Sequence, residues 1–200
     1  MSYFMKNLFL TSSFSDVYLD FKNSIKDSLV GKTVTFIPTA SKVEDITFYV
    51  DEDRLAFEKL GMLVEVLDID QESYEIIEKT LNKNDYIFVS GGNTFFLLQE
   101  LKKSQTDKII SKLINQGKPY IGSSAGSIIL APDIEYIKNM DDASKAPELT
   151  STNALAITNF SVLPHFKEEP FSDITQEIFS HFYQKTVLVP LTNRQFICIN

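Results

Sequence analysis

Short apolar runs alternate with longer stretches of helical periodicity along the first half of the chain. Four runs rich in β-branched and aromatic residues predict strands, at residues 7–11, 33–37, 63–68 and 86–90. Each gap between these runs is long enough for a crossover helix, and in the third gap Tyr74, Ile77 and Leu81 recur at the spacing of one helical face. The pattern therefore predicts parallel strands joined by helices.

The alternation continues to about residue 130 and then becomes less regular. The run Tyr86-Ile87-Phe88-Val89 has little polarity, as expected of a parallel strand that helices cover on both faces. Further strands are predicted at 120–122, 160–163, 187–189 and 196–199, and further helices up to residue 117 and at 127–130 and 172–183. We therefore expect one α/β domain over residues 1–200, a three-layer fold with a doubly wound, flavodoxin-like, mostly parallel sheet and helices on both faces.

Charge and cysteine content narrow the class of function. The chain has 27 Asp and Glu against 19 Lys and Arg, a formal net charge of −8, which disfavours binding to nucleic acid or to anionic membranes. Its single cysteine, Cys198, cannot form an internal disulfide, and cysteine-rich zinc sites are excluded by number. The N-terminal segment lacks the apolar core of a signal peptide, so a cytoplasmic location is expected.

A nucleophile motif lies between a predicted strand and a predicted helix. Residues 122–126 read Gly-Ser-Ser-Ala-Gly, a G-x-S-x-G motif centred on Ser124. In such a turn the central residue takes strained backbone angles that hold its hydroxyl outward, and the two glycines avoid a clash between the arms. The alternative is a tight turn with an idle serine. Ser123 is a weaker candidate, because Ile121 and Ala125 stand where the motif needs glycine.

A glycine pair provides a candidate oxyanion site. The turn Gly91-Gly92-Asn93 also follows a predicted strand and precedes a helix. In a parallel sheet it therefore emerges at the same edge as the turn around Ser124. Backbone groups of this turn, together with the amide of Ala125 after the nucleophile, are suited to bind an oxyanion. Alternatively, the glycines form an ordinary turn and Asn93 caps the helix that follows.

A general base has to be one of two histidines. His165 follows the predicted strand at 160–163 and can reach the edge that carries Ser124, whereas His181 lies late in a predicted helix, where a structural role is expected. The sequence does not decide which residue orients the histidine. The candidates are two acids between serine and histidine and four residues after the histidine, namely Asp141, Asp142, Glu168, Glu169, Asp173 and Asn193.

Three motifs in this order carry a family resemblance: the turn at 91–94, the elbow at 122–126 and the segment Leu163-Pro164-His165-Phe166. On them the chain resembles the peptidase E family of serine peptidases, which are related to cyanophycinases and share the class I glutamine amidotransferase-like fold. The resemblance covers most of the chain. It implies Ser124 as nucleophile, His165 as general base and an oxyanion site from the amides around Gly92 and Ala125.

Two positions depart from the family pattern. In the family an acid in the loop before the last strand is paired with the histidine, and the matching residue here is Asn193, which can orient a histidine but carries no charge. Asp141 and Asp142 stay alternatives for this role. Members that cleave after an N-terminal aspartate share a glycine- and arginine-containing stretch after the histidine, whereas residues 167–171 here read Lys-Glu-Glu-Pro-Phe.

These observations together predict a dipeptidase-like serine peptidase that hydrolyses small peptides through an acyl-enzyme, as a monomer or homodimer and without metal or organic cofactor. Peptides with an N-terminal aspartate are the substrates that the resemblance alone suggests. Two alternatives stay open. One is a small acyl esterase, which would share the elbow, and the other is a binding or sensor member of the same fold that is catalytically impaired.

Overall fold

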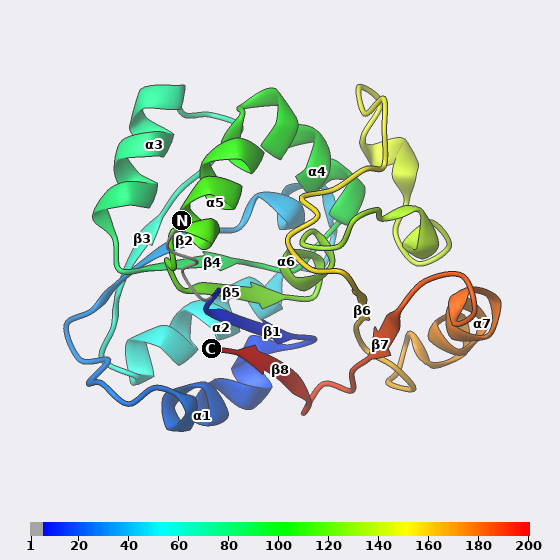
Figure 1. The fold of residues 1–200 in the computed structure, drawn as a ribbon, viewed down its shortest axis with the longest axis horizontal. Helices are drawn as coiled ribbons and strands as arrows, with labels where there is room; N and C mark the ends of the chain where they lie inside the picture. Colours follow the sequence, from blue (N-terminus) through cyan, green and yellow to red (C-terminus); the bar gives the residue numbers. More distant parts are fainter. Residues whose placement is uncertain (1–5) are drawn as a thin grey trace.

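Six strands form the central sheet of the computed structural model, which describes residues 6–200 (Figure 1). Their order is β3-β2-β4-β5-β1-β8, and neighbouring strands are parallel except for β8, which runs antiparallel to β1. Residues 1–5, part of the segment in which no signal peptide is expected, lie outside the described residues. The strands are β1 (Leu8–Thr11), β2 (Thr33–Ile37), β3 (Leu63–Val66), β4 (Tyr86–Val89), β5 (Tyr120–Ser123) and β8 (Phe196–Ile199).

Helices cover both faces of this sheet, with α1 and α2 on one face and α3, α4 and α5 on the other (Figure 1). The chain passes from β1 to β2 and β3 in one direction and then returns to β4 and β5. Because crossovers between parallel strands are right-handed, this reversal places the second set of helices on the opposite face. The predicted doubly wound α/β class is therefore confirmed. The helices are α1 (Phe14–Ser24), α2 (Phe48–Lys59), α3 (Tyr74–Lys83), α4 (Thr94–Lys103) and α5 (Thr106–Asn115).

The two faces of the sheet are packed with different side chains. Tyr86 and Phe88 of β4 belong to a cluster rich in phenylalanine beneath α1 and α2, whereas Ile87 and Val89 belong to an aliphatic cluster beneath α3, α4 and α5. Alternate residues of a strand face opposite sides, so a run without charged residues fits a strand that is buried on both faces. All four residues of β4 are buried, which gives the loop that follows a firmly packed base.

The connections that follow β5 and β1 leave toward opposite faces of the sheet. β5 leads into the short helix α6 (Ala125–Ile128), which packs on the aliphatic face, whereas β1 leads into α1 on the aromatic face. Neighbouring strands whose connections leave toward opposite faces open a crevice at their carboxyl ends, and ligands bind there in this class of fold.

The last third of the chain departs from the regular pattern. Strands form near all three of the positions expected there, but β6 and β7 pair with each other in a separate parallel sheet beside the central one, close to α7 (Figure 1). Among the described residues no helix is both long and apolar enough to cross a membrane. The remaining elements are η1 (Thr39–Val43), η2 (Glu135–Ile137), η3 (Ala143–Lys145), β6 (Ser161–Leu163), α7 (Ser172–Phe182) and β7 (Leu188–Pro190).

Candidate active site

Ser124 lies in a strained turn between β5 and α6. Its backbone angles are φ 48° and ψ −108°, where residues other than glycine are strained. The flanking glycines allow this turn to close. A Cβ at Gly122 would lie 2.6 Å from the carbonyl carbon of Gly126, and a Cβ at Gly126 would lie 2.0 Å from the carbonyl oxygen of Val89. The motif at 122–126 therefore forms the sharp strand-to-helix turn that the sequence predicts.

Hydrogen bonds tie this turn to the end of β1. The Ser124 N–H donates to the Thr11 carbonyl oxygen over 3.0 Å. The buried Ser127 hydroxyl accepts from the Thr11 N–H over 2.9 Å and lies 2.8 Å from the carbonyl oxygens of Thr11 and Gly122. Since these groups are buried, they fix the position of Ser124 relative to the central sheet.

The neighbouring Ser123 and the acid Asp53 form a buried cap for α1. The Ser123 hydroxyl accepts from the Phe14 N–H over 3.2 Å, and Asp53 Oδ1 accepts from the Ser15 N–H over 2.9 Å. Burial raises the pKa of Asp53 to about 7, although hydrogen bonds from Ser15 and Ser123 act in the opposite direction. These contacts replace the side-chain cap that Ser13 does not make at the start of α1. The hydroxyl of Ser123 therefore stabilises the start of that helix.

His165 joins Ser124 and Asn193 in one chain of hydrogen bonds. Its Nε2 lies 3.0 Å from Ser124 Oγ, and its Nδ1 lies 2.7 Å from Asn193 Oδ1. Burial lowers the pKa of His165, so the ring is mainly neutral at neutral pH. With Nδ1 protonated toward the Asn193 oxygen, Nε2 is free to accept the serine proton. Phe171 stacks on the imidazole, with ring centroids 5.2 Å apart.

Ser12, directly after β1, is a residue that the sequence motifs do not reveal. Ser12 is 1% exposed, and its hydroxyl accepts from the His165 N–H over 3.1 Å and donates to the Leu191 carbonyl oxygen over 3.0 Å. One hydroxyl thus joins the central sheet to the loops that carry His165 and Asn193. The signal that could have found it is position, because a polar residue directly after a parallel strand lies at the same edge as Ser124.

The turn after β4 lies against the serine. A Cβ at Gly91 would be 3.3 Å from the Cβ of Ser124, and Gly92 has a φ of 130° and leaves no room for a side chain, since its Cβ would lie 2.3 Å from the Ala40 carbonyl. Within residues 6–200 the amides of Gly91 and Gly92 donate to no other group. Ala125 begins α6, so its amide has no partner inside that helix. Among the described residues these three amides thus have no hydrogen-bond partner, and Gly91 lies against the side chain of Ser124.

Asn93 does not share this position. Its Oδ1 accepts from the Phe96 N–H over 3.0 Å, its own N–H donates to the Ala40 carbonyl oxygen over 2.9 Å, and its Nδ2 donates to the Asp142 carbonyl oxygen over 3.0 Å. Its polar groups are thus already paired in capping α4 and in holding the following segment. The structure thus places Asn93 as the cap of α4, the alternative that the sequence also allows.

Residues 8–200 match the sequence profile of peptidase family S51. The chain belongs to this family. A Listeria monocytogenes protein named uncharacterized peptidase Lmo0363 is 53% identical to it over 98% of this chain and 95% of its own. A Drosophila melanogaster protein named probable alpha-aspartyl dipeptidase is 35% identical over 68% of this chain and 52% of its own. The crystal structure of a Listeria monocytogenes EGD-e protein assigned to peptidase E superposes with a TM-score of 0.93, at 52% identity over 98% of this chain and 94% of that chain. This S51 member is a serine peptidase.

Two acids expected as alternatives to Asn193 lie elsewhere in the S51 peptidase. Asp141 Oδ2 accepts from the Thr94 N–H over 2.8 Å at the start of α4, and burial raises its pKa to about 6. Asp142 is exposed, and its Oδ1 accepts from the Ser144 N–H over 2.9 Å. Neither acid contacts the histidine, because the segment around η3 packs against α4. Of the three candidates, only Asn193 is brought to the imidazole.

The acids after the histidine differ in their surroundings. Glu169 and Asp173 are exposed, whereas Glu168 is partly buried, and its Oε1 accepts from the Asn193 N–H over 3.4 Å. Within residues 6–200 no group of three or more His, Cys, Asp or Glu side chains is arranged to hold a metal ion.

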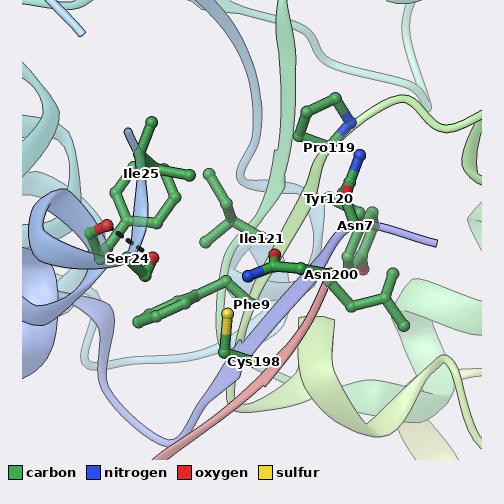
Figure 2. Close-up of a pocket in the computed structure, with 11 residues that line it drawn as sticks. Asn7, Phe9, Ser24, Ile25, Pro119, Tyr120, Ile121, Cys198 and Asn200 are labelled. Carbon is green, nitrogen blue, oxygen red and sulfur yellow. Dashed lines mark hydrogen bonds between the residues drawn. The ribbon is translucent and has the colours of Figure 1, made fainter. Parts of the chain in front are cut away.

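The other histidine and the cysteine of the S51 peptidase lie away from Ser124. His181 is exposed on α7, where its Nε2 lies 2.8 Å from the Lys185 Nζ. Cys198 is exposed on β8 opposite Phe9 and borders a small crevice at the amino ends of β1 and β5 (Figure 2). That crevice, with a cavity volume of about 20 Å³, has room for about one water molecule. Ser124 follows the opposite, carboxyl end of β5.

Proposed function

We propose that the chain is a dipeptidase-like serine peptidase in which Ser124 is the nucleophile, His165 the general base and Asn193 the residue that orients the histidine. The observation that carries this proposal is the continuous chain of hydrogen bonds from Ser124 Oγ through both ring nitrogens of His165 to Asn193. A nucleophile, a base within hydrogen-bond reach and a group that fixes the base are the parts that acyl transfer requires.

In the proposed reaction, Ser124 Oγ attacks the carbonyl carbon of the scissile amide while His165 Nε2 takes the hydroxyl proton. The amides of Gly91, Gly92 and Ala125 bind the negative charge that develops on the carbonyl oxygen. The imidazolium then gives its proton to the leaving amine as the C–N bond breaks, which leaves an acyl-enzyme. Water that is deprotonated by His165 hydrolyses this ester and restores the serine.

Short peptides, and dipeptides in particular, are the proposed substrates. A relative is named an alpha-aspartyl dipeptidase, but the loop after His165 contains no arginine, and the ammonium of its exposed Lys167 lies 5.4 Å over the Phe166 ring. The net charge of −8 also disfavours an acidic substrate. We therefore expect neutral dipeptides to be cleaved at least as fast as dipeptides with an N-terminal aspartate.

Labelling with a fluorophosphonate tests the proposal, because this reagent reacts with activated serines. We expect the wild-type chain to label, Ser124→Ala to abolish labelling and His165→Ala to slow it by at least about a hundredfold. His181→Ala and Cys198→Ala are the matched controls and should label like the wild type. A wild-type chain that does not label would favour the impaired binding or sensor alternative, and hydrolysis of acyl esters without hydrolysis of dipeptides would favour the esterase.

We also propose that the enzyme acts in the cytoplasm. Its free and exposed cysteine, Cys198, is a side chain that the reducing conditions of that compartment keep as a thiol. Fractionation of the cells that produce the chain, with blotting of each fraction, tests this. Recovery of the protein outside the cytoplasm would contradict it.

A further inference from the structure

The proposed active site leaves a positive charge without an obvious partner. When His165 takes the proton of Ser124 it becomes a cation, and the residue at its Nδ1, Asn193, is neutral. In triads with a carboxylate, the orienting residue also stabilises the imidazolium by its charge. An amide fixes the orientation of the ring but does not supply that charge.

Glu168 contacts Asn193 through the backbone. Its Oε1 accepts from the Asn193 N–H over 3.4 Å. Its backbone is fixed from both sides, because its N–H donates to the His165 carbonyl oxygen over 3.0 Å and its carbonyl oxygen accepts from the Phe171 N–H over 2.7 Å. Glu168 therefore belongs to the same short loop as the histidine, and its carboxylate contacts the backbone of the residue that orients the ring.

We propose that Glu168 is a positioning residue whose carboxylate, hydrogen-bonded to the backbone of Asn193, stabilises the imidazolium that forms at His165 during catalysis. The proposal rests on the proposed function of Ser124 and His165. Burial lowers the pKa of His165, whereas the hydrogen bond to Asn193 and, to a smaller extent, the negative charge of Glu168 raise it. Glu168 is partly buried, whereas Glu169 is exposed, so solvent screens the charge of Glu168 less.

Other charged side chains near the histidine include those of Asp16, Lys167 and Arg194. Asp16, in the first turn of α1, also raises the pKa of His165, by less than Glu168 does. Lys167 places its ammonium over the Phe166 ring, and Arg194, next to Asn193, is exposed. Asp16 lies on α1, and among residues 6–200 Glu168 is the acid that combines charge with a hydrogen bond to the orienting residue.

A purely structural role is the alternative that the experiment has to exclude. The carboxylate could only anchor the backbone of Asn193, without any effect of its charge. Glu168→Gln separates the two roles, because its amide oxygen still accepts the Asn193 N–H while the charge is removed, whereas Glu168→Ala removes both. Glu169→Gln is the matched control, since it removes one charge from the neighbouring exposed position.

The test measures the pKa of His165 and the reactivity of Ser124 separately. With His181→Ala as background, His165 is the single histidine of the chain, so NMR titration of the full chain reads its pKa directly. The rate of fluorophosphonate labelling as a function of pH reads the serine. We expect Glu168→Gln to lower the His165 pKa by about half a unit and to slow labelling by about threefold, and Glu169→Gln to change both much less.

Two outcomes would overturn the role of Glu168. One is a Glu168→Gln variant with wild-type pKa and wild-type labelling while Glu168→Ala labels slowly, because the role is then only structural. The other is an equal effect of Glu168→Gln and Glu169→Gln, because any charge of this surface then suffices. If the wild-type chain labels and Ser124→Ala does not, the proposed function stands whatever Glu168 does. If nothing labels, the proposed function fails, and the NMR titration still measures the charge effect.

Discussion

Ser124 lies at the end of a central strand, whereas His165 and Asn193 lie on loops of the small β6–β7 sheet beside it. The turn around Ser124 is surrounded by buried backbone, and added atoms at its glycines would meet backbone atoms of Val89 and of the turn itself. The histidine loop is only partly buried, and its link to the central sheet includes a single hydroxyl, that of Ser12.

This difference separates two kinds of mutational effect. Close-packed backbone leaves no room for relaxation, so changes at the serine turn act mainly on the free energy of unfolding. Loops held by a few hydrogen bonds can shift by a fraction of an ångström without unfolding, so changes there act mainly on the geometry between base and nucleophile. The predictions below test this division.

The largest effect is expected at Gly126. Gly126→Ala would place a Cβ 2.0 Å from the Val89 carbonyl oxygen, so β4 and the turn cannot keep their present distance. We expect the free energy of unfolding to fall by about 4 kcal/mol or more, measured by urea denaturation. Gly31→Ala is the matched control, because its Cβ meets nothing within 4 Å and only its positive φ is unfavourable, at about 1 kcal/mol. Equal losses in both variants would contradict the close packing of the turn.

The next effect concerns the buried acid beneath the turn. Burial raises the pKa of Asp53 to about 7, whereas the unfolded chain has a value of about 3.9. The folded state therefore holds this proton more tightly, and its stabilising contribution is complete below about pH 4 and is lost as the pH rises to about 7, by about 4 kcal/mol in total. Asp53→Asn keeps an acceptor for the Ser15 N–H and cannot ionise.

We accordingly expect Asp53→Asn to be more stable than the wild type by about 2–4 kcal/mol at about pH 8 and to lose this advantage near pH 4. Urea denaturation of both proteins across this pH range measures the difference. Asp51→Asn, at an exposed position of the same helix, is the control and should change the pH dependence little. A wild-type chain whose stability rises between pH 5 and 7 relative to Asp53→Asn would contradict the prediction.

The third effect tests the histidine side. Ser12→Ala removes the hydroxyl that accepts from the His165 N–H and donates to the Leu191 carbonyl oxygen. We expect kcat on a dipeptide to fall by about tenfold, with KM little changed and a loss of stability of about 1–2 kcal/mol. Ser13→Ala is the control, because the Ser13 hydroxyl contacts only that of Ser15. A change in KM with an unchanged kcat would mean that Ser12 acts on substrate binding instead.

The same division explains what the sequence can predict. The serine turn is encoded locally, by two glycines around Ser124 and by the strand before it, and the turn at 91–92 follows the same rule for parallel strands. His165 is predictable as a candidate because the chain has two histidines. Asn193 could not be chosen over Asp141 from the sequence, because its place depends on the pairing of β6 with β7, which sets Leu163 opposite Pro190.

Contacts between distant segments account for most of what the sequence does not reveal. The hydroxyl of Ser12 and the amide of His165 are 153 positions apart, and Ser15 and Asp53 are 38 positions apart. Each pair consists of ordinary polar residues without a motif, and each matters only because folding buries it. Asn93 shows the reverse case, since a motif suggested ligand binding and the folded chain uses the side chain as a helix cap.

A smaller effect on activity than that of Ser12→Ala is expected at the residue that orients the histidine. Asn193→Asp would place a carboxylate oxygen at the position now 2.7 Å from His165 Nδ1, so the imidazolium gains a charged partner. A negative charge beside the ring raises its pKa, and we expect an increase of about one unit. The base is then protonated up to a higher pH, so the acidic limb of the kcat/KM profile moves to higher pH by the same amount. The rate at about pH 8 changes by less than about fivefold.

NMR titration in the His181→Ala background checks the pKa of His165 independently of activity. An unchanged limb together with a raised pKa would show that His165 is not the group whose ionisation controls the rate, and the loop would then hold a structural histidine beside a serine that has another base.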